Sequence, residues 1–80
     1  LRNAEEALIV ATKLNADTGN KVPQVLDTLA AAQAANGQFT KAEKSAEMAI
    51  SQIKNAPKLK QSIQNRLNLY KKRKKFFAEY

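Results

Sequence analysis

The sequence predicts an all-α fold, and three observations support that prediction. Residue types that favour helices, such as Ala, Lys, Leu, Gln and Glu, dominate the chain of 80 residues. Only two Gly and two Pro are present, which leaves room for a few long elements. Apolar residues recur at spacings of three and four, which is the period of an amphipathic helix. We therefore expect four helices in one small domain.

The first helix is expected within residues 1–14. Asn3 suits its N-cap, and Glu6 completes a capping box. Apolar residues follow on one face: Ala4, Ala7, Leu8, Ala11 and Leu14. Residues 15–21 are predicted to form a polar loop, because Gly19 and Asn20 tolerate the positive φ that ends a helix.

Residues 22–54 predict a helical hairpin. Pro23 fits the first turn of its first helix, where the amide hydrogen that proline lacks has no partner. This helix is expected to stop at Asn36-Gly37. Thr40 and Glu43 form a second capping box, so the next helix is expected to begin near Thr40, with Phe39 packing on its first turn. The inner stripe of that helix comprises Ala42, Ala46, Ala49, Ile50 and Ile53.

The last helix is predicted to run from Pro57 toward Tyr80, over about 36 Å at 1.5 Å per residue. Its last turns are expected to fray, because the five consecutive cations from Lys71 to Lys75 repel one another. One stripe of it comprises Leu59, Ile63, Leu67, Tyr70, Lys74 and Phe77. Residues 54–80 hold nine basic and one acidic side chain, whereas residues 1–53 hold five basic and six acidic ones. The net charge of +7 therefore belongs to this last element.

An internal repeat links the second and fourth helices. Pro23 and Pro57 stand 34 residues apart, and each opens a helix. Leu29 and Ile63 match at the same shift. A period of this length in an all-helical chain indicates stacked helical hairpins.

A set of small and large residues at fixed spacing resembles the tetratricopeptide repeat family, in a version common in bacterial proteins. The set comprises Leu26, Leu29, Ala30, Gly37, Phe39, Ala42, Ala46, Ala49 and Ile50. The resemblance implies a fragment of an α-solenoid. Residues 1–14 would be the second helix of a partial repeat, residues 22–54 a full repeat, and residues 57–80 a basic capping helix. Gln33 and Ala46 depart from the family pattern, which favours aromatic residues there, and Lys54 replaces the usual proline.

The resemblance also implies a function, which is the non-catalytic binding of a peptide or protein partner. The first helix of the full repeat would line a shallow groove with Gln24, Asp27, Thr28, Ala31 and Ala35. Chaperone-binding members hold a peptide carboxylate with Lys and Asn, and Asp27 and Ala31 stand at the decisive positions here. That ligand class is therefore disfavoured. The simpler interpretation of Asp27 is a carboxylate stabilised near a helix N-terminus.

A run of five cations suggests an alternative function. The run comprises Lys71, Lys72, Arg73, Lys74 and Lys75, with aromatic residues on both sides. Such a segment can attract nucleic acid or an anionic membrane surface. The competing interpretation is a solvated outer face at the end of a helical stack.

Enzymatic chemistry has little support, because the chain contains no Cys and no His. No zinc site, cofactor or metal is expected, and no base accompanies Ser45, Ser51 or Ser62. The carboxylates are expected on outer helix faces: Glu5, Glu6, Glu43 and Glu47. A cytoplasmic location is favoured, since no run approaches the ~20 apolar residues of a membrane span and no signal peptide is recognisable.

The chain is expected to be part of a longer protein, with an apolar edge near its start. That edge is predicted around Leu1, Leu8 and Ala11. We expect preceding repeats or self-association to cover it.

Overall fold

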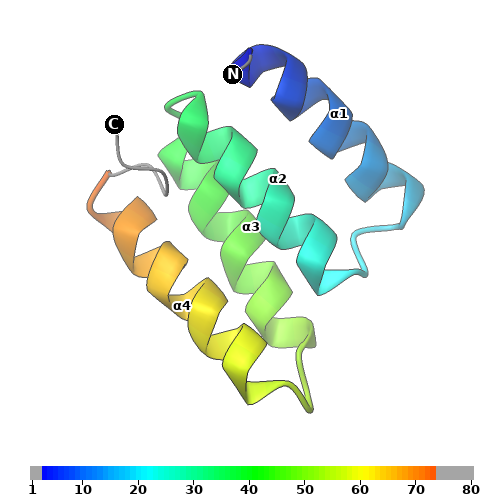
Figure 1. Cartoon of the computed structure of the whole chain (residues 1–80), viewed down its shortest axis with the longest axis vertical. Helices are drawn as coiled ribbons and strands as arrows, with labels where there is room; N and C mark the ends of the chain where they lie inside the picture. The colour runs from blue at the N-terminus through cyan, green and yellow to red at the C-terminus, as the bar shows by residue number, and fades with distance from the viewer. Residues whose placement is uncertain (1–2, 74–80) are drawn as a thin grey trace.

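The computed structural model describes residues 3–73 of the chain. In that range the chain forms four helices, α1 (Ala4–Asp17), α2 (Pro23–Ala35), α3 (Phe39–Gln52) and α4 (Pro57–Lys71), and no strand. Figure 1 shows that each helix runs antiparallel to the one before it and beside it. The predicted all-α fold of helical hairpins is therefore confirmed.

Helix α1 begins as predicted and ends later than predicted. The Oδ1 atom of Asn3 accepts hydrogen bonds from the amides of Glu5 and Glu6, at 3.0 and 3.2 Å. The loop predicted from residue 15 was placed three residues too early, because α1 continues to Asp17. The Thr18 hydroxyl closes the helix by donating to the Leu14 carbonyl at 3.1 Å.

Proline opens α2 and α4, and glycine ends α2, as the sequence predicts. Gly37 has a φ of 78°, a left-handed conformation that costs glycine little. The predicted capping box at Thr40 is wrong, since α3 already begins at Phe39 and its N-cap is Gln38. No side chain caps the start of α3, and the Phe39 ring packs against the main core.

Helix α4 is shorter than predicted. It ends at Lys71, and Arg73 adopts a φ of 62°, which stops a helix from continuing. Residues 72 and 73 form a turn, within the run of cations where the last turns were expected to fray. Lys74, Lys75 and Phe77 lie outside the described residues, and so does Leu1.

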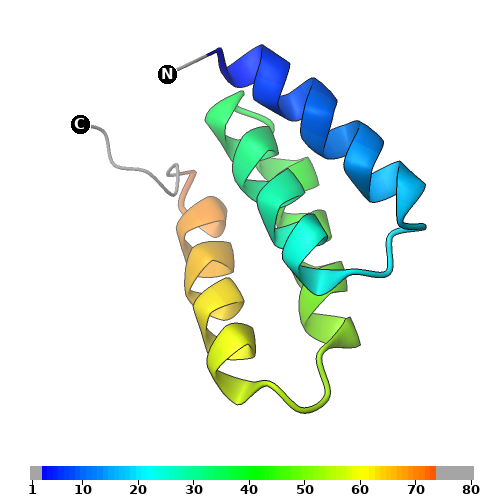
Figure 2. The same ribbon diagram turned by 45° about the vertical axis from the view of Figure 1, so that its right-hand side comes forward.

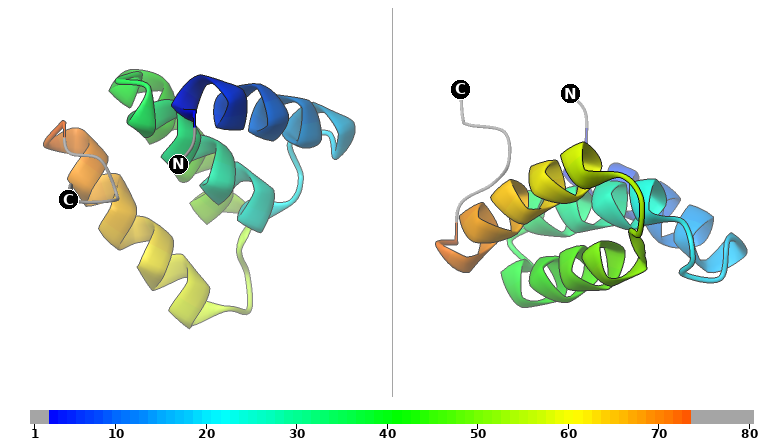
Figure 3. Two further views of the ribbon diagram at one scale, coloured as in Figure 1. Left: turned by 45° about the horizontal axis from the view of Figure 1, so that its top comes forward. Right: turned by 90° about the horizontal axis from the view of Figure 1, so that it is seen from below.

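The main core lies between α2, α3 and α4. Alanines of α2 and α3 pack together with Leu26 of α2 and with larger side chains of α4. The backbones that approach closely in this core are those of α2 with α3 and of α3 with α4. The fully or almost fully buried members are Leu26, Ala30, Ala34, Ala42, Ala46, Ala49, Ile63, Leu67 and Tyr70. Figure 3 shows α3 on one side of α2, with α4 and α1 flanking α2.

A second, smaller core joins α1 to α2. It consists of Ala11, Leu29 and Ala32, with half-buried Leu8 packed against it. The predicted apolar edge was therefore misplaced, since Leu8 and Ala11 face α2. The apolar side chains that α1 exposes are Ile9, Val10 and Leu14.

Candidate polypeptide-binding surface

Helix α2 has neighbours on three sides and solvent on the fourth. Leu26, Ala30 and Ala34 face the main core, whereas Leu29 and Ala32 face α1. At 100° per residue, the remaining side carries the residues predicted to bind a partner. We call this side the α2 face: Gln24, Asp27, Thr28, Ala31 and Ala35.

The α2 face combines small and polar side chains. Gln24 and Thr28 are exposed, while Ala31 and Ala35 are half-buried. The Thr28 hydroxyl donates to the Gln24 carbonyl of its own helix at 3.0 Å, so its oxygen lone pairs remain able to accept. Figure 2 shows α1 and α4 on opposite sides of α2, so they border this face.

Asp27 lies at the α4 border of this face and forms an ion pair with Arg66. The Arg66 Nε donates to Oδ1 at 3.0 Å, and Nη2 donates to Oδ2 at 2.5 Å. The two side chains are only 15% and 21% exposed. This bidentate geometry is the strong form of a salt bridge. The interpretation of Asp27 as a simple helix N-terminal carboxylate is therefore incomplete, since its partner lies on another helix.

Tyr70 lies behind this ion pair, fully buried. Burial, followed by the negative charge of Asp27, raises the pKa of Tyr70 to about 12. Among residues 3–73 no hydrogen-bond partner is found for the Tyr70 hydroxyl. The hydrogen bond from Arg66 to Asp27 is also the main cause of a raised Arg66 pKa. Arg66 therefore stays positively charged beside Asp27.

The charges at this border cancel. The negative charge of Asp27 is balanced by the positive charge of Arg66. The remaining residues of the α2 face are uncharged. The structure thus brings together all five predicted residues on one face. Arg66 was not predicted as part of this site. The sequence feature that could have indicated it is a single arginine among the lysines of α4, at a position that faces inward.

The predicted basic run does not form one described patch. Lys71 and Lys72 are exposed, while Lys74 and Lys75 lie outside the described residues. Arg73 turns back toward α3, where its Nη1 lies 3.7 Å from a Glu43 carboxylate oxygen. Its guanidinium carbon lies 6.0 Å from the centre of the Phe39 ring. Glu43 is thus half-buried and paired, and its prediction as an outer-face residue is corrected.

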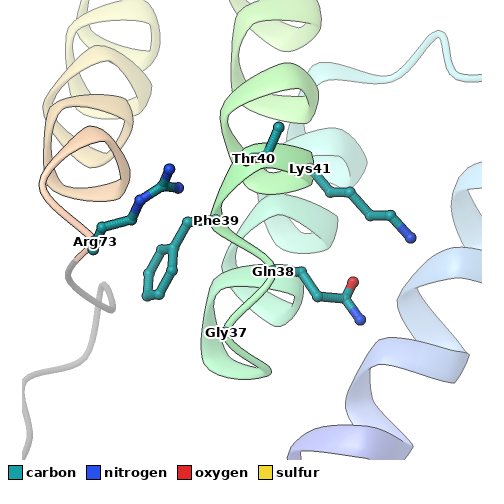
Figure 4. Close-up of a pocket in the computed structure, with 6 residues that line it drawn as sticks. All are labelled: Gly37, Gln38, Phe39, Thr40, Lys41 and Arg73. Carbon is teal, nitrogen blue, oxygen red and sulfur yellow. The ribbon is translucent and has the colours of Figure 1, made fainter.

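A shallow hollow of about 470 Å³ lies at the turn between α2 and α3. It is lined by Gly37, Gln38, Phe39, Thr40, Lys41 and Arg73. Figure 4 shows Lys41 and Arg73 extending to opposite sides of this turn, so the two cations do not converge on one point. The hollow lies beyond the C-terminal end of α2, away from the middle of the α2 face.

One departure from the repeat pattern has a structural partner. Gln33 accepts a hydrogen bond from the Ser45 hydroxyl at 2.7 Å, with Ser45 buried. This polar contact fastens α2 to α3 at a position where the resembling family favours an aromatic residue.

No cluster of three or more acidic, His or Cys side chains suited to a metal ion occurs within residues 3–73. No helix in that range combines the length and the apolar character that crossing a membrane requires.

No protein-family model matches this chain, and no curated protein or solved structure does. The resemblance to tetratricopeptide repeats therefore stays a prediction from the residues themselves.

Proposed function

We propose that this domain is a non-catalytic binding module of the tetratricopeptide type, which holds a polypeptide segment along the α2 face. The observation that carries the proposal is the open side of α2, bordered by two further helices. Half-buried Ala31 and Ala35 let a ligand backbone approach closely, and Gln24 and Thr28 offer hydrogen-bonding groups beside it.

The dimensions and charge of the face define the ligand. Helix α2 has 13 residues, so the face extends for about 20 Å. An extended peptide of about six residues covers that length at roughly 3.3 Å per residue. Because Asp27 is neutralised by Arg66, the ligand we expect is an uncharged segment with small or polar side chains.

The test starts with peptides selected from a random library on the immobilised domain. The affinity of a selected peptide is then measured for the Thr28→Lys and Ala31→Arg variants. We expect losses of at least tenfold, since each change places a long charged side chain on the face. Ser51→Lys is the matched control, because the Ser51 hydroxyl also bonds to its own helix and is exposed on α3.

Equal affinity for all these variants would overturn the proposal. Peptide-induced NMR shifts of backbone amides that lie away from α2 would also overturn it.

The alternative function, binding to anionic surfaces through the basic residues, has a separate test. Heparin retention and binding to vesicles containing phosphatidylserine are measured across a salt series, with Lys71 and Lys72 changed to Gln. Salt-dependent binding that these changes abolish would favour the alternative.

A further inference from the structure

Helix α1 exposes an apolar stripe on the side turned away from α2. Val10 is 64% exposed and Leu14 is 47% exposed. Large apolar side chains in contact with solvent at helical spacing mark a surface that another polypeptide can cover. We call this stripe and its borders the α1 outer face, which comprises Glu6, Ala7, Val10, Lys13 and Leu14.

The α1 outer face is arranged symmetrically about Val10. At 100° per residue, Glu6 and Lys13 lie on one side of Val10, and Ala7 and Leu14 lie on the other. Each pair consists of one residue before Val10 and one after it, at a distance of about one helical turn. One pair has opposite charges, and the other combines a small residue with a large one.

From this pattern we infer that a second copy of this chain docks on the α1 outer face, with the two α1 helices antiparallel about a two-fold axis through Val10. That axis places Glu6 of one copy opposite Lys13 of the other, and Ala7 opposite Leu14, with each contact made twice. A surface that is complementary to itself in charge and in size is what an isologous interface requires. The Lys13–Asp17 contact within α1 competes weakly, since it is long, at 3.6 Å, and exposed.

The opposite end of the molecule argues against head-to-tail association. The outer side of α4 carries Lys60, Gln64 and Asn68, which are polar. Such a surface does not complement the apolar stripe of α1. Pairing of α1 with α1 covers Val10 and Leu14 with apolar surface, whereas pairing of α1 with α4 would place them against polar side chains.

The first experiment uses the absence of cysteine from the chain. In the Val10→Cys variant the two thiols lie on the axis, so mild oxidation should give a disulfide-linked dimer. Asp17→Cys is the register control, since its two copies would lie about 21 Å apart along antiparallel helices. Met48→Cys is the matched exposure control, because Met48 is 43% exposed on α3. Equal crosslinking of all three variants would overturn the proposed geometry.

The second experiment measures the dimer dissociation constant by sedimentation up to about 1 mM. One helix face buries less area than the roughly 1,200 Å² of a stable complex, so we expect a constant on the order of 0.1 mM. Val10→Glu should weaken the dimer at least tenfold. Glu6→Lys and Lys13→Glu should each weaken it about five- to tenfold, and the double exchange should restore it. Circular dichroism checks that these exposed changes leave the helices intact.

A strictly monomeric chain at 1 mM would overturn the inference. A double exchange that fails to restore the dimer would overturn it as well. If the α1 variants instead lose affinity for a selected peptide while the chain stays monomeric, the inference is also overturned. The α1 outer face then binds a different polypeptide. Failure of the dimer inference would not affect the proposed function of the α2 face, because none of these variants changes a residue of α2.

Discussion

The two outer helices, α1 and α4, are attached to the central hairpin in different ways. Helix α4 is rich in cations, yet it buries Ile63, Leu67 and Tyr70 to 3% exposure or less. Helix α1 has the more apolar sequence, yet it buries Ala11 and leaves Val10 and Leu14 exposed. The attachment of each helix thus depends on where its apolar residues fall, because those that face a neighbouring helix leave water.

The 34-residue repeat in the sequence relates α2 to α4. At the shift of 34 residues, Leu26 corresponds to Lys60, Ala30 to Gln64 and Ala34 to Asn68. Helix α2 uses these apolar positions to pack against α3 and α4. The corresponding positions of α4 are polar.

The largest expected effect comes from truncating a large side chain of α4. Ile63→Ala should lower the free energy of unfolding by about 2–5 kcal/mol, because it leaves a cavity in a fully buried site. Leu8→Ala in α1 should cost about 1 kcal/mol, since Leu8 is half-buried. Urea unfolding followed by far-UV circular dichroism measures both values. Equal losses would contradict the difference between the two outer helices.

Alkaline pH should weaken the attachment of α4. The pKa of Tyr70 is raised to about 12 from the usual 10.0, so the folded state holds this proton more tightly than the unfolded state does. Protonated Tyr70 therefore contributes roughly 2–3 kcal/mol to the free energy of unfolding below pH ~10. This contribution is lost as the pH rises through about 12. Unfolding measured from pH 9 to 12 checks this, with Tyr70→Phe as the control. A pH profile that Tyr70→Phe leaves unchanged would contradict it.

Removing one member of the Asp27–Arg66 pair should have an intermediate effect. Asp27→Ala leaves the Arg66 guanidinium, at 21% exposure, without its carboxylate. We expect a loss of about 1–2 kcal/mol, which is below the 3–5 kcal/mol of a fully buried pair. A double-mutant cycle with Arg66→Ala isolates the coupling. A coupling energy near zero would show that the pair does not help to hold α4 beside α2.

The smallest effect is expected at the contact between α1 and the end of α2. The Asn36 side-chain amide donates to the Ala4 carbonyl at 2.9 Å and to the Ala32 carbonyl at 2.8 Å. Asn36→Ala should cost about 1 kcal/mol. Hydrogen exchange should show the loss of protection concentrated in α1, because α4 makes no use of this bond. Uniform loss across all four helices would mean that α1 does not open separately.

Several features of the fold followed from short-range rules and were predicted. The helix starts at Pro23 and Pro57, the turn at Gly37 and the N-cap at Asn3 depend on atoms within a few residues of one another. The alanine stripe of α3 followed from its periodicity. The predictions at Thr40 and near residue 72 differ from the structure beside contacts between helices. Phe39 packs on the core and interacts with Arg73, and neither contact is visible in local sequence.

Four helices, their order and the side of α2 with the candidate binding residues were predictable from the sequence, because helical periodicity fixes which side chains share a face. Three outcomes depend on packing between helices. Asp27 pairs with Arg66, Leu8 and Ala11 turn inward, and Val10 and Leu14 stay in solvent. These outcomes depend on how one helix is rotated against another. That rotation is set by side-chain volumes on both partners, which no single stretch of sequence contains.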